Sequence, residues 1–229
     1  MTVEKINLME AGIYSIPQAS WLVGAPQRAV RVWVEGQHGR QRPIIENQIG
    51  RIGRKVAVSF TNLMELRFVH FFVSAGVSLK EIRSILDEVK RTIGHPHPFA
   101  TKTIFKTDGR KIVAEIARRN GLSTIYDLRT GNYEMIDIVM ESLKSGVAYE
   151  VGGDAIYWTP RPIKAPNIIV HPKHSFGKPI LKKSHIPTDV IARAFEVEGD
   201  AATVSELYEV PEKQVCEAVA FERDLRLAA

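Results

Sequence analysis

The sequence of 229 residues contains a single cysteine, Cys216. One thiol excludes an internal disulfide and any zinc site built from several cysteines. Because Cys216 lies on an apolar helical pattern, we expect a small buried side chain rather than a nucleophile. The sequence also lacks an apolar run of membrane-spanning length, and its start lacks the apolar core of a signal peptide. We therefore expect a cytoplasmic protein without a membrane segment.

Motifs that carry enzymatic chemistry are also missing. There is no glycine-rich phosphate loop, no nucleophile-elbow pattern and no recognisable metal triad. The close histidine pairs His95/His97 and His171/His174 lack the helical spacing and nearby carboxylates of a metal site. Three isolated aspartates are as readily turn or surface residues, namely Asp108, Asp137 and Asp154. We expect no enzymatic activity, no catalytic residues, no metal and no cofactor.

Charge is distributed unevenly along the chain. The net charge is +5, and residues 1–95 carry 13 Lys and Arg against 8 Asp and Glu. Residues 160–195 carry 7 against 1, whereas residues 196–229 carry 3 against 9. Basic segments suit a polyanion and the acidic end suits a different partner, so the pattern indicates two surfaces with two roles.

The stretch Ile13–Val34 predicts two short helices, Pro17–Val23 and Pro26–Val34, because its apolar residues recur at helical spacing. Gly24-Ala25 supplies a tight break, and proline suits the first position of a helix. Two helices joined by so short a turn form a helix-turn-helix, whose second helix can enter the major groove of DNA. A short helical pair in an ordinary core would show the same pattern. The side chains expected to contact base edges or phosphates are Gln27, Arg28 and Arg31.

A basic hairpin is expected directly after this pair. Pro43–Ile45 and Lys55–Phe60 are candidate strands, joined through a loop that contains Gly50 and Gly53. Such a hairpin is a wing that can lie along the phosphate backbone and position the protein. A solvated basic loop is the alternative for any single arginine. The residues expected to contact phosphates are Arg40, Arg42, Arg51, Arg54 and Lys55.

Two further helices are predicted next. Thr61–Ser74 is strongly apolar, and Leu79–Ile93 places Ile82, Ile85, Leu86 and Val89 along one side. Ser78-Leu79-Lys80-Glu81 is a capping box that opens the second of these helices.

The order of these elements resembles the MerR-type winged-helix DNA-binding domain over roughly residues 11–93. The resemblance rests on the helix-turn-helix, the basic wing, SFTNLMELRFV and AGVSLKEIRSIL. It implies DNA binding by a dimer, with Pro26–Val34 as the recognition helix and Arg51–Lys55 in the wing. The long coiled-coil helix and the cysteine cluster of metal-sensing members are missing.

The middle of the chain turns toward strands after His95-Pro96-His97-Pro98, which ends any helix. The segment has no net charge and no chemical constellation. We interpret it as a connecting segment with a small sheet. The expected strands are Thr103–Lys106, Lys111–Glu115 (beyond an Asp108-Gly109 turn), Ser123–Leu128 and Ala155–Thr159, with a helix at Tyr133–Leu143.

The final segment predicts a second helix pair. Ile168–Val170 and Pro179–Leu181 are candidate strands, and Thr188 can cap a helix over Asp189–Glu196. Aligning Pro211 with Pro26 then superimposes the apolar positions of the first pair on Val204–Tyr208 and Pro211–Phe221. The second helix of this pair displays several glutamates, and glutamates that face phosphates are repelled, so this pair suits protein rather than DNA. The candidate partner-binding residues are Glu212, Gln214, Glu217, Arg223 and Arg226.

This segment resembles a small antitoxin-associated domain of unknown function, through GKP, a hydrophobic pair, IPT and the terminal helix pair. Lys183-Ser184-His185 replaces the G-T-R usual in that domain. With the MerR-like start and PHPFATKTIFKTDGR, nearly the whole chain resembles VapB-type antitoxins of mycobacterial toxin–antitoxin pairs. That resemblance implies a PIN-like ribonuclease toxin as partner, held inactive by the antitoxin.

The expected fold is mainly α with small β elements (α+β). Its expected domains are a winged helix-turn-helix over 1–95, a β-rich connecting segment over 96–163 and a helix-turn-helix-like domain over 164–229. The expected function is a nucleoid-associated antitoxin that represses transcription as a homodimer on duplex operator DNA and neutralises its toxin. The alternative is a stand-alone MerR-like regulator that senses a small ligand.

Overall fold

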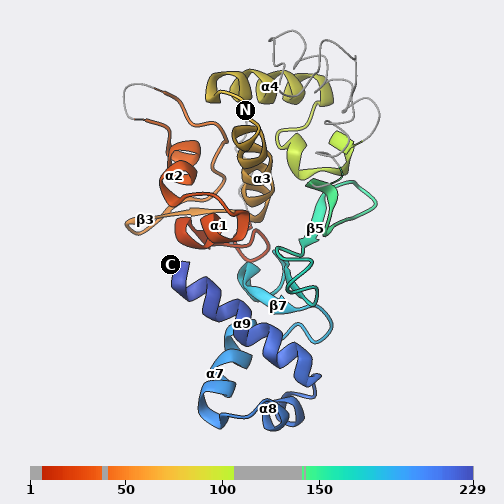
Figure 1. Cartoon of the computed structure of the whole chain (residues 1–229). Coiled ribbons are helices and arrows are strands. Elements are labelled where there is room, and N and C mark those ends of the chain that lie inside the picture. Colours follow the sequence, from red (N-terminus) through yellow and green to blue (C-terminus); the bar gives the residue numbers. More distant parts are fainter. Residues whose placement is uncertain (1–6, 38–40, 106–140, 142, 229) are drawn as a thin grey trace. The chain divides into compact units, whose positions relative to one another are not determined.

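The computed structural model confirms the α+β fold and describes residues 7–37, 41–105, 141 and 143–228 (Figure 1). The chain divides into two compact units, each assembled from segments that lie apart in the sequence. The first unit combines Met1–Gln27, Gln48–Phe60 and Ile156–Ala229, and the second combines Arg28–Asn47 and Thr61–Ala155. The division into three consecutive domains stays a prediction. In the described part of the chain, no helix is both long and apolar enough to span a membrane.

The described part of the first unit contains two small antiparallel arrangements of strands, four α-helices and one 3₁₀ helix. One sheet has the order β1-β3-β2, and in the other β6 lies between β5 and β7. The predicted strands at 155–159, 168–170 and 179–181 are confirmed as β5, β6 and β7. The elements of this unit are β1 (Tyr14–Ser15), α1 (Ile16–Val23), β2 (Gly50–Ile52), β3 (Lys55–Val58), β5 (Ala155–Trp158), β6 (Ile168–Val170), η3 (Ser175–Gly177), β7 (Pro179–Leu181), α7 (Thr188–Glu198), α8 (Ala201–Tyr208) and α9 (Glu212–Ala228).

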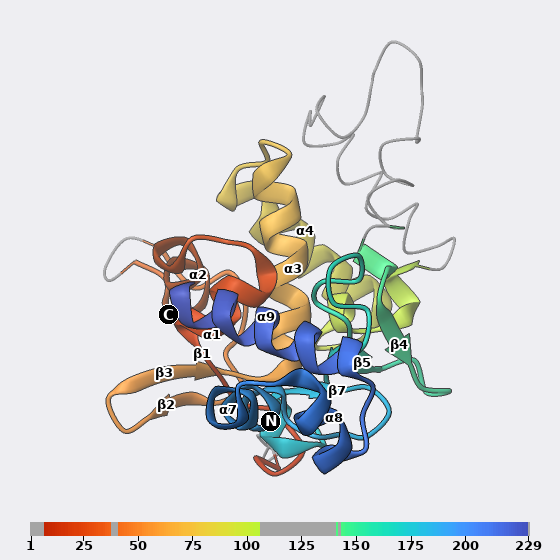
Figure 2. The ribbon, with the colours of Figure 1, turned by 60° about the horizontal axis from the view of Figure 1, so that its bottom comes forward.

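The last three helices pack on one another. The long helix α9 lies along α7 and α8 (Figures 1 and 2). Ile191, Val204 and Val215 come from the three helices in turn, and each is completely buried. Burial of one aliphatic side chain of this size contributes about 1.5–3 kcal/mol, so these contacts hold the three-helix group together.

The predicted cap of α7 is wrong. Pro187, not Thr188, precedes the helix, and no side chain caps it. The Thr188 hydroxyl is buried, lies 3.2 Å from the carbonyl oxygen of Pro179 and also contacts the Glu222 carboxyl group of α9. The hydroxyl therefore joins α7 to β7 and α9 instead of satisfying the first turn of its own helix.

The part of the second unit that the structure describes is mainly helical. The capping box of α4 is confirmed, because Ser78 accepts from the Glu81 N–H at 3.3 Å and the Glu81 carboxylate accepts from the Ser78 N–H at 3.0 Å. The four predicted core residues of this helix are buried. The elements are α2 (Gln27–Glu35), α3 (Phe60–Ser74), α4 (Leu79–Ile93), η1 (Pro98–Ala100), η2 (Lys102–Phe105) and β4 (Val147–Tyr149).

An aromatic contact joins α3 to η1 in this unit. The rings of Phe68 and Phe99 stack with centroids 4.2 Å apart. The strand expected at Thr103–Lys106 is wrong where the structure describes it, since 102–105 form a 3₁₀ helix that buries Ile104 completely. The run is short, and packing of one apolar side chain overrides its β propensity. The strands and the turn expected within 106–140 lie outside the described residues, as does the helix expected at Tyr133–Leu143 except for residues 141 and 143, which are helical.

The strand expected at Pro43–Ile45 is also wrong. Ile44 and Ile45 are buried, and their N–H groups both donate to the Trp33 carbonyl oxygen at the end of α2, at 2.8 and 3.3 Å. The apolar pair therefore packs against a helix end, where carbonyl groups lack intrahelical partners. The first hairpin strand is β2, which has a single apolar residue, Ile52, and exposes it.

Candidate functional site

Helix α2 presents a polar, cationic face. Val30, Trp33 and Val34 are buried along one side. The predicted contact residues lie on the opposite side and are all exposed, namely Gln27, Arg28 and Arg31. One guanidinium nitrogen of Arg31 lies 3.9 Å from the Glu35 carboxylate, and this side chain is 63% exposed. An exposed pair of this kind contributes little energy, so the arginine can exchange it for a phosphate or a base.

The turn before α2 is fixed by three local features. Ser15 caps α1 and forms a capping box with Gln18. The buried Ser20 hydroxyl donates to the Ala25 carbonyl oxygen. Gly24 closes the helix in the left-handed region, at φ 85°, where a residue without Cβ has no steric cost. These contacts cap α1 and end it at the tight break that the sequence predicts at Gly24-Ala25.

The same three features recur 185 residues later, as the alignment of Pro211 with Pro26 predicts. Asp200 caps α8 and accepts from the Thr203 N–H at 2.8 Å. The Ser205 hydroxyl donates to the Val210 carbonyl oxygen at 2.6 Å. Glu209 takes the left-handed conformation of Gly24, at φ 53°. The predicted second helix pair, α8 and α9, is therefore present.

The exposed positions of the two pairs differ. Where α2 carries Gln27, Arg28 and Arg31, the aligned residues of α9 are Glu212, Lys213 and Cys216. All three are exposed, so the expectation that Cys216 is buried is wrong. The buried stripe of α9 runs through Val215, Ala218, Phe221 and Leu225, and Cys216 lies outside it.

The predicted partner-binding residues on α9 divide into two groups. Glu217 is buried, and its carboxylate accepts from the backbone N–H of Asn167 at 2.7 Å and from its side-chain amide at 3.0 Å. It fastens the chain before β6 to α9 and is not available to a partner in this structure. Gln214 is half-buried, and the exposed members of the set are Glu212, Arg223 and Arg226.

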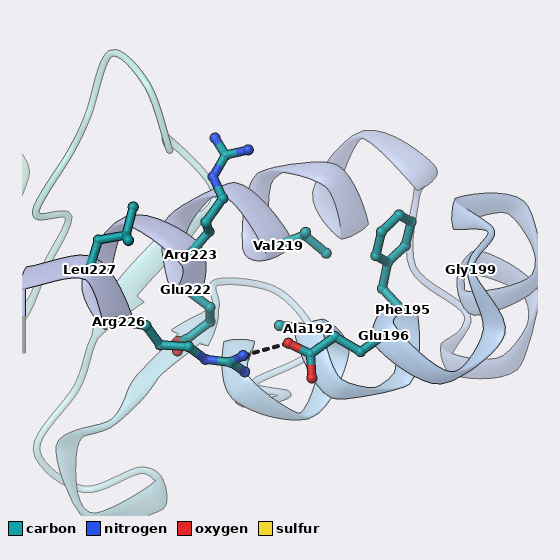
Figure 3. A pocket seen from close by; sticks show the side chains of 9 residues that line it. All are labelled: Ala192, Phe195, Glu196, Gly199, Val219, Glu222, Arg223, Arg226 and Leu227. Carbon is teal, nitrogen blue, oxygen red and sulfur yellow. Dashed lines mark hydrogen bonds and ion pairs between the residues drawn. The ribbon is translucent and has the colours of Figure 1, made fainter.

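An open groove of about 540 Å³ lies between α7 and α9 (Figure 3). Phe195 of α7 and Val219 of α9 contribute apolar side chains, and Arg223 lies at its edge. Arg226 forms an ion pair with Glu196 across the groove. The groove thus combines an apolar lining with two of the predicted partner-binding residues, Arg223 and Arg226.

Glu222 lines this groove, and the residue is only 6% exposed. Burial raises its pKa, and the neighbouring Asp189 carboxylate acts in the same direction. The contact with the Thr188 hydroxyl and the charges of Arg226 and Lys178 oppose this shift. Burial is the largest cause, so the neutral acid is favoured relative to a carboxyl group in water.

The basic hairpin consists of β2 and β3 and lies in the first unit (Figure 2). Gly53 and Arg54 form its two-residue turn, with Ile52 paired to Lys55. The predicted Arg51, Arg54 and Lys55 are all exposed at this end of the hairpin. The predicted bounds of the first strand are wrong, the structure gathers these three basic residues at one end of the hairpin, and their role as a wing stays a prediction.

The other two predicted phosphate contacts lie outside the hairpin. Arg42 forms an ion pair with Asp87 of α4, and its carbonyl oxygen accepts from the Arg83 side chain at 3.2 Å. Arg40 lies outside the described residues.

Helix α1 is held against α9 by contacts that sequence reasoning missed. The rings of Trp21 and Phe221 meet edge to face with centroids 4.7 Å apart. The Arg161 guanidinium lies 4.7 Å from the centroid of the Trp21 ring and donates to the carbonyl oxygens of Trp21 and Leu22, at 2.6 and 3.1 Å. Arg161 thereby satisfies carbonyl groups at the C-terminal end of α1. Because it lies far from α1 along the chain, no sequence pattern around α1 predicts this contact.

The first histidine pair has structural partners. His97 lies 3.1 Å from the buried Glu65 carboxylate, which also accepts from the Asn62 amide at 3.1 Å. His95 lies 3.6 Å from Asp154. Within the described ranges, no three His, Cys, Asp or Glu side chains are placed to share a metal ion.

The chain is similar to a distant relative in sequence and to a solved structure in fold. No family model matches the chain. A protein of Mycobacterium tuberculosis (strain ATCC 25618 / H37Rv) described as "Putative antitoxin VapB45" is 23% identical over 233 residues, which cover 90% of this chain and 92% of that protein. The X-ray crystal structure of Rv2018 from Mycobacterium tuberculosis matches with a TM-score of 0.71 at 21% identity, covering 90% of this chain and 96% of that one. The two chains share a fold.

Proposed function

We propose that the protein is the antitoxin of a type II toxin–antitoxin pair. In this proposal it has no enzymatic activity, represses transcription as a homodimer on duplex operator DNA, and neutralises a PIN-like ribonuclease toxin by direct binding. The similarity to a protein described as an antitoxin, which extends over 90% of this chain, carries the proposal. The exposed cations of α2 and of the hairpin support its DNA-binding part.

The chemistry of α2 suits the major groove. Arginine can donate two parallel hydrogen bonds to guanine, and glutamine can pair with adenine. We therefore assign base contacts to Gln27, Arg28 and Arg31, and phosphate contacts to Arg51, Arg54 and Lys55 of the hairpin. A dimer of helix-turn-helix proteins places its recognition helices one helical turn apart, so we expect a palindromic operator.

The DNA-binding part is tested by titrating the full-length protein onto the DNA upstream of its gene. Arg28→Ala and Arg31→Ala should each weaken operator binding by about 1–3 kcal/mol, because each removes one charged contact. Arg54→Ala should weaken binding to operator and unrelated DNA by similar factors, because phosphates carry no sequence information. Wild-type affinity in both α2 variants would remove the recognition-helix assignment.

We assign toxin binding to the groove between α7 and α9. An apolar groove bordered by arginines fits an amphipathic segment of the toxin that carries acidic residues. Deleting the chain after Glu196 would be a poor test, because α9 also supports α1 through Trp21 and Phe221. Point variants on the exposed edge leave these contacts in place.

The partner is identified by co-purification from cells that also express the neighbouring gene. Arg223→Glu should abolish recovery of the toxin while operator binding is retained, because the arginine is exposed at the groove edge. Lys213→Glu on the same helix is the matched control and should recover the toxin normally. Absence of a toxin, together with a small ligand that changes operator affinity, would instead favour a stand-alone regulator.

A further inference from the structure

Three imidazole rings lie together in the loops on either side of β7. The His174 ring centroid is 4.4 Å from that of His171 and 4.2 Å from that of His185. Tyr157 of β5 stacks on His171 at 6.3 Å, and the ammonium group of Lys182 lies 5.2 Å from the centroid of the tyrosine ring. These five residues, all in the first unit, are called the imidazole cluster.

The surroundings of the cluster are positively charged. The pKa of His171 is lowered to about 4, first by burial and then by the positive charges of His174, His185 and Lys173. No carboxylate contributes to this shift. Lys173, Lys182 and Lys183 are exposed, and within the described part of the chain none of them forms an ion pair with a carboxylate. Protons on the imidazoles therefore repel one another and the lysines.

A metal ion does not explain the cluster. The rings of His171 and His174 meet edge to face at 78°, and those of His174 and His185 are tilted by 36°. Nδ1 of His171 accepts from the Lys173 N–H at 3.2 Å. These three histidines are not placed to share a metal ion, as no such group occurs among the described residues.

The loops that carry the cluster are held in an unusual conformation. Ser175, Phe176 and His185 lie in the left-handed region, at φ 47°, 55° and 57°. The Phe176 carbonyl oxygen accepts from the Ile13 N–H at 2.8 Å, which fixes the first loop, while the phenylalanine side chain stays 52% exposed. The cationic groups are therefore presented on a supported backbone beside an exposed aromatic ring.

We propose that the imidazole cluster binds the phosphate groups of nucleic acid, and binds them more tightly as the pH falls. A phosphate placed against the cluster offsets the repulsion between protonated imidazoles and lysines, so binding and proton uptake favour each other. The exposed ring of Phe176 provides a stacking surface for a base. The cluster shares no residue with α2 or with the hairpin, and the proposal does not require either of them to bind DNA.

The test measures fluorescence anisotropy of a labelled DNA duplex and of a single-stranded RNA with the full-length protein. At about pH 6 the wild type should bind at least one of them on the order of tenfold more tightly than at about pH 8, at constant ionic strength. The arm that shows the gain identifies the nucleic acid. No gain on either one would overturn the proposal.

Variants show which residues cause the increase in affinity at low pH. His174→Gln combined with His185→Asn should reduce it to less than about twofold, and asparagine tolerates the left-handed conformation at position 185. Lys182→Ala should weaken binding at both pH values, whereas Lys213→Ala on α9 is the control and should change neither. A pH-dependent gain that survives the double histidine variant contradicts the proposal. Arg28→Ala distinguishes this proposal from the proposed function. It should weaken operator binding and leave the pH-dependent gain unchanged.

Discussion

The turn between α1 and α2 and the turn between α8 and α9 have the same local design. In each, a side chain caps the first helix, a serine hydroxyl donates five residues ahead to a backbone carbonyl, and a left-handed residue ends that helix. The exposed residues that follow differ, since Arg28 and Arg31 of α2 align with Lys213 and Cys216 of α9. A few buried or conformationally restricted positions thus determine the turn, while the exposed positions are free to determine the partner.

The helices that follow the two turns, α2 and α9, also differ in the kind of residue that they bury. In α9, Glu217 and Glu222 point inward and make hydrogen bonds to Asn167 and Thr188. In α2, the inward positions are apolar. Helix α9 is therefore joined by polar contacts on its buried side to the chain around it, which suits a structural and partner-binding helix rather than one that enters a DNA groove.

Charge reversal on α2 should give the largest difference between the two pairs. Arg28→Glu with Arg31→Glu should weaken DNA binding by on the order of 100-fold or more, because two attractive contacts become repulsive. Lys213→Glu, at the position aligned with Arg28, should leave DNA affinity within about twofold. Anisotropy titrations on operator DNA check both. Equal losses in the two variants would mean that the pairs do not differ in DNA binding.

The two serines should contribute to stability in the same way but to different degrees. Ser20→Ala should lower the free energy of unfolding by about 1–2 kcal/mol, because it removes the donor from a buried carbonyl. Ser205→Ala should cost about 1 kcal/mol, since that serine is half-buried. Urea unfolding followed by circular dichroism measures both. Unchanged stability in Ser20→Ala would show that its hydrogen bond does not hold the first turn.

The left-handed residues should respond with opposite signs. Gly24→Ala should destabilise the protein by about 1 kcal/mol, because a Cβ at this φ is strained. Glu209→Gly should stabilise it by a few tenths to about 1 kcal/mol. Glycine relieves the strain of the folded state, and this gain exceeds the loss that comes from the greater entropy of glycine in the unfolded chain. The same unfolding assay applies. Destabilisation by both changes would refute the equivalence of the two positions.

The smallest effect concerns pH. Burial raises the pKa of Glu222, so the folded protein holds this proton at pH values where the unfolded chain has lost it. The resulting stabilisation is complete below the unfolded pKa and is lost as the pH rises through the folded pKa. Glu222→Gln cannot ionise and should remove this decline while keeping a hydrogen bond to Thr188. Superimposable pH profiles of unfolding for the two proteins would contradict the assignment.

The longer elements could be predicted from the sequence because they carry periodic apolar residues and local caps. The helices at 61–74 and 79–93 were predicted to within one residue of α3 and α4, and α2 exposes the expected Gln27, Arg28 and Arg31. Shorter elements were not predictable in this way. Ile44 and Ile45 suggested a strand, yet they pack at a helix end, whereas β2 carries only one apolar residue.

Contacts between distant segments left no signal in the sequence. Arg161 caps α1 from 139 residues away, and Thr188 contacts Glu222 instead of capping its own helix. His185 lies apart from the His171/His174 pair along the chain, so the imidazole cluster was visible only after folding. Charge patterning did separate the basic from the acidic segment, so this part of the site, like the exposed face of α2, could be inferred from the sequence.

The salt dependence of DNA binding tests the central contrast most directly. The slope of log K against log salt counts the phosphates that the protein neutralises, at roughly 0.9 per phosphate. Both the affinity and this slope are measured for the wild type, Arg28→Ala and Lys213→Ala. Together they show which of the two helix pairs contacts DNA. The account predicts a weaker affinity or a shallower slope for Arg28→Ala and no change for Lys213→Ala. Wild-type affinity and slope in Arg28→Ala, or a loss in Lys213→Ala as large as that in Arg28→Ala, would contradict it.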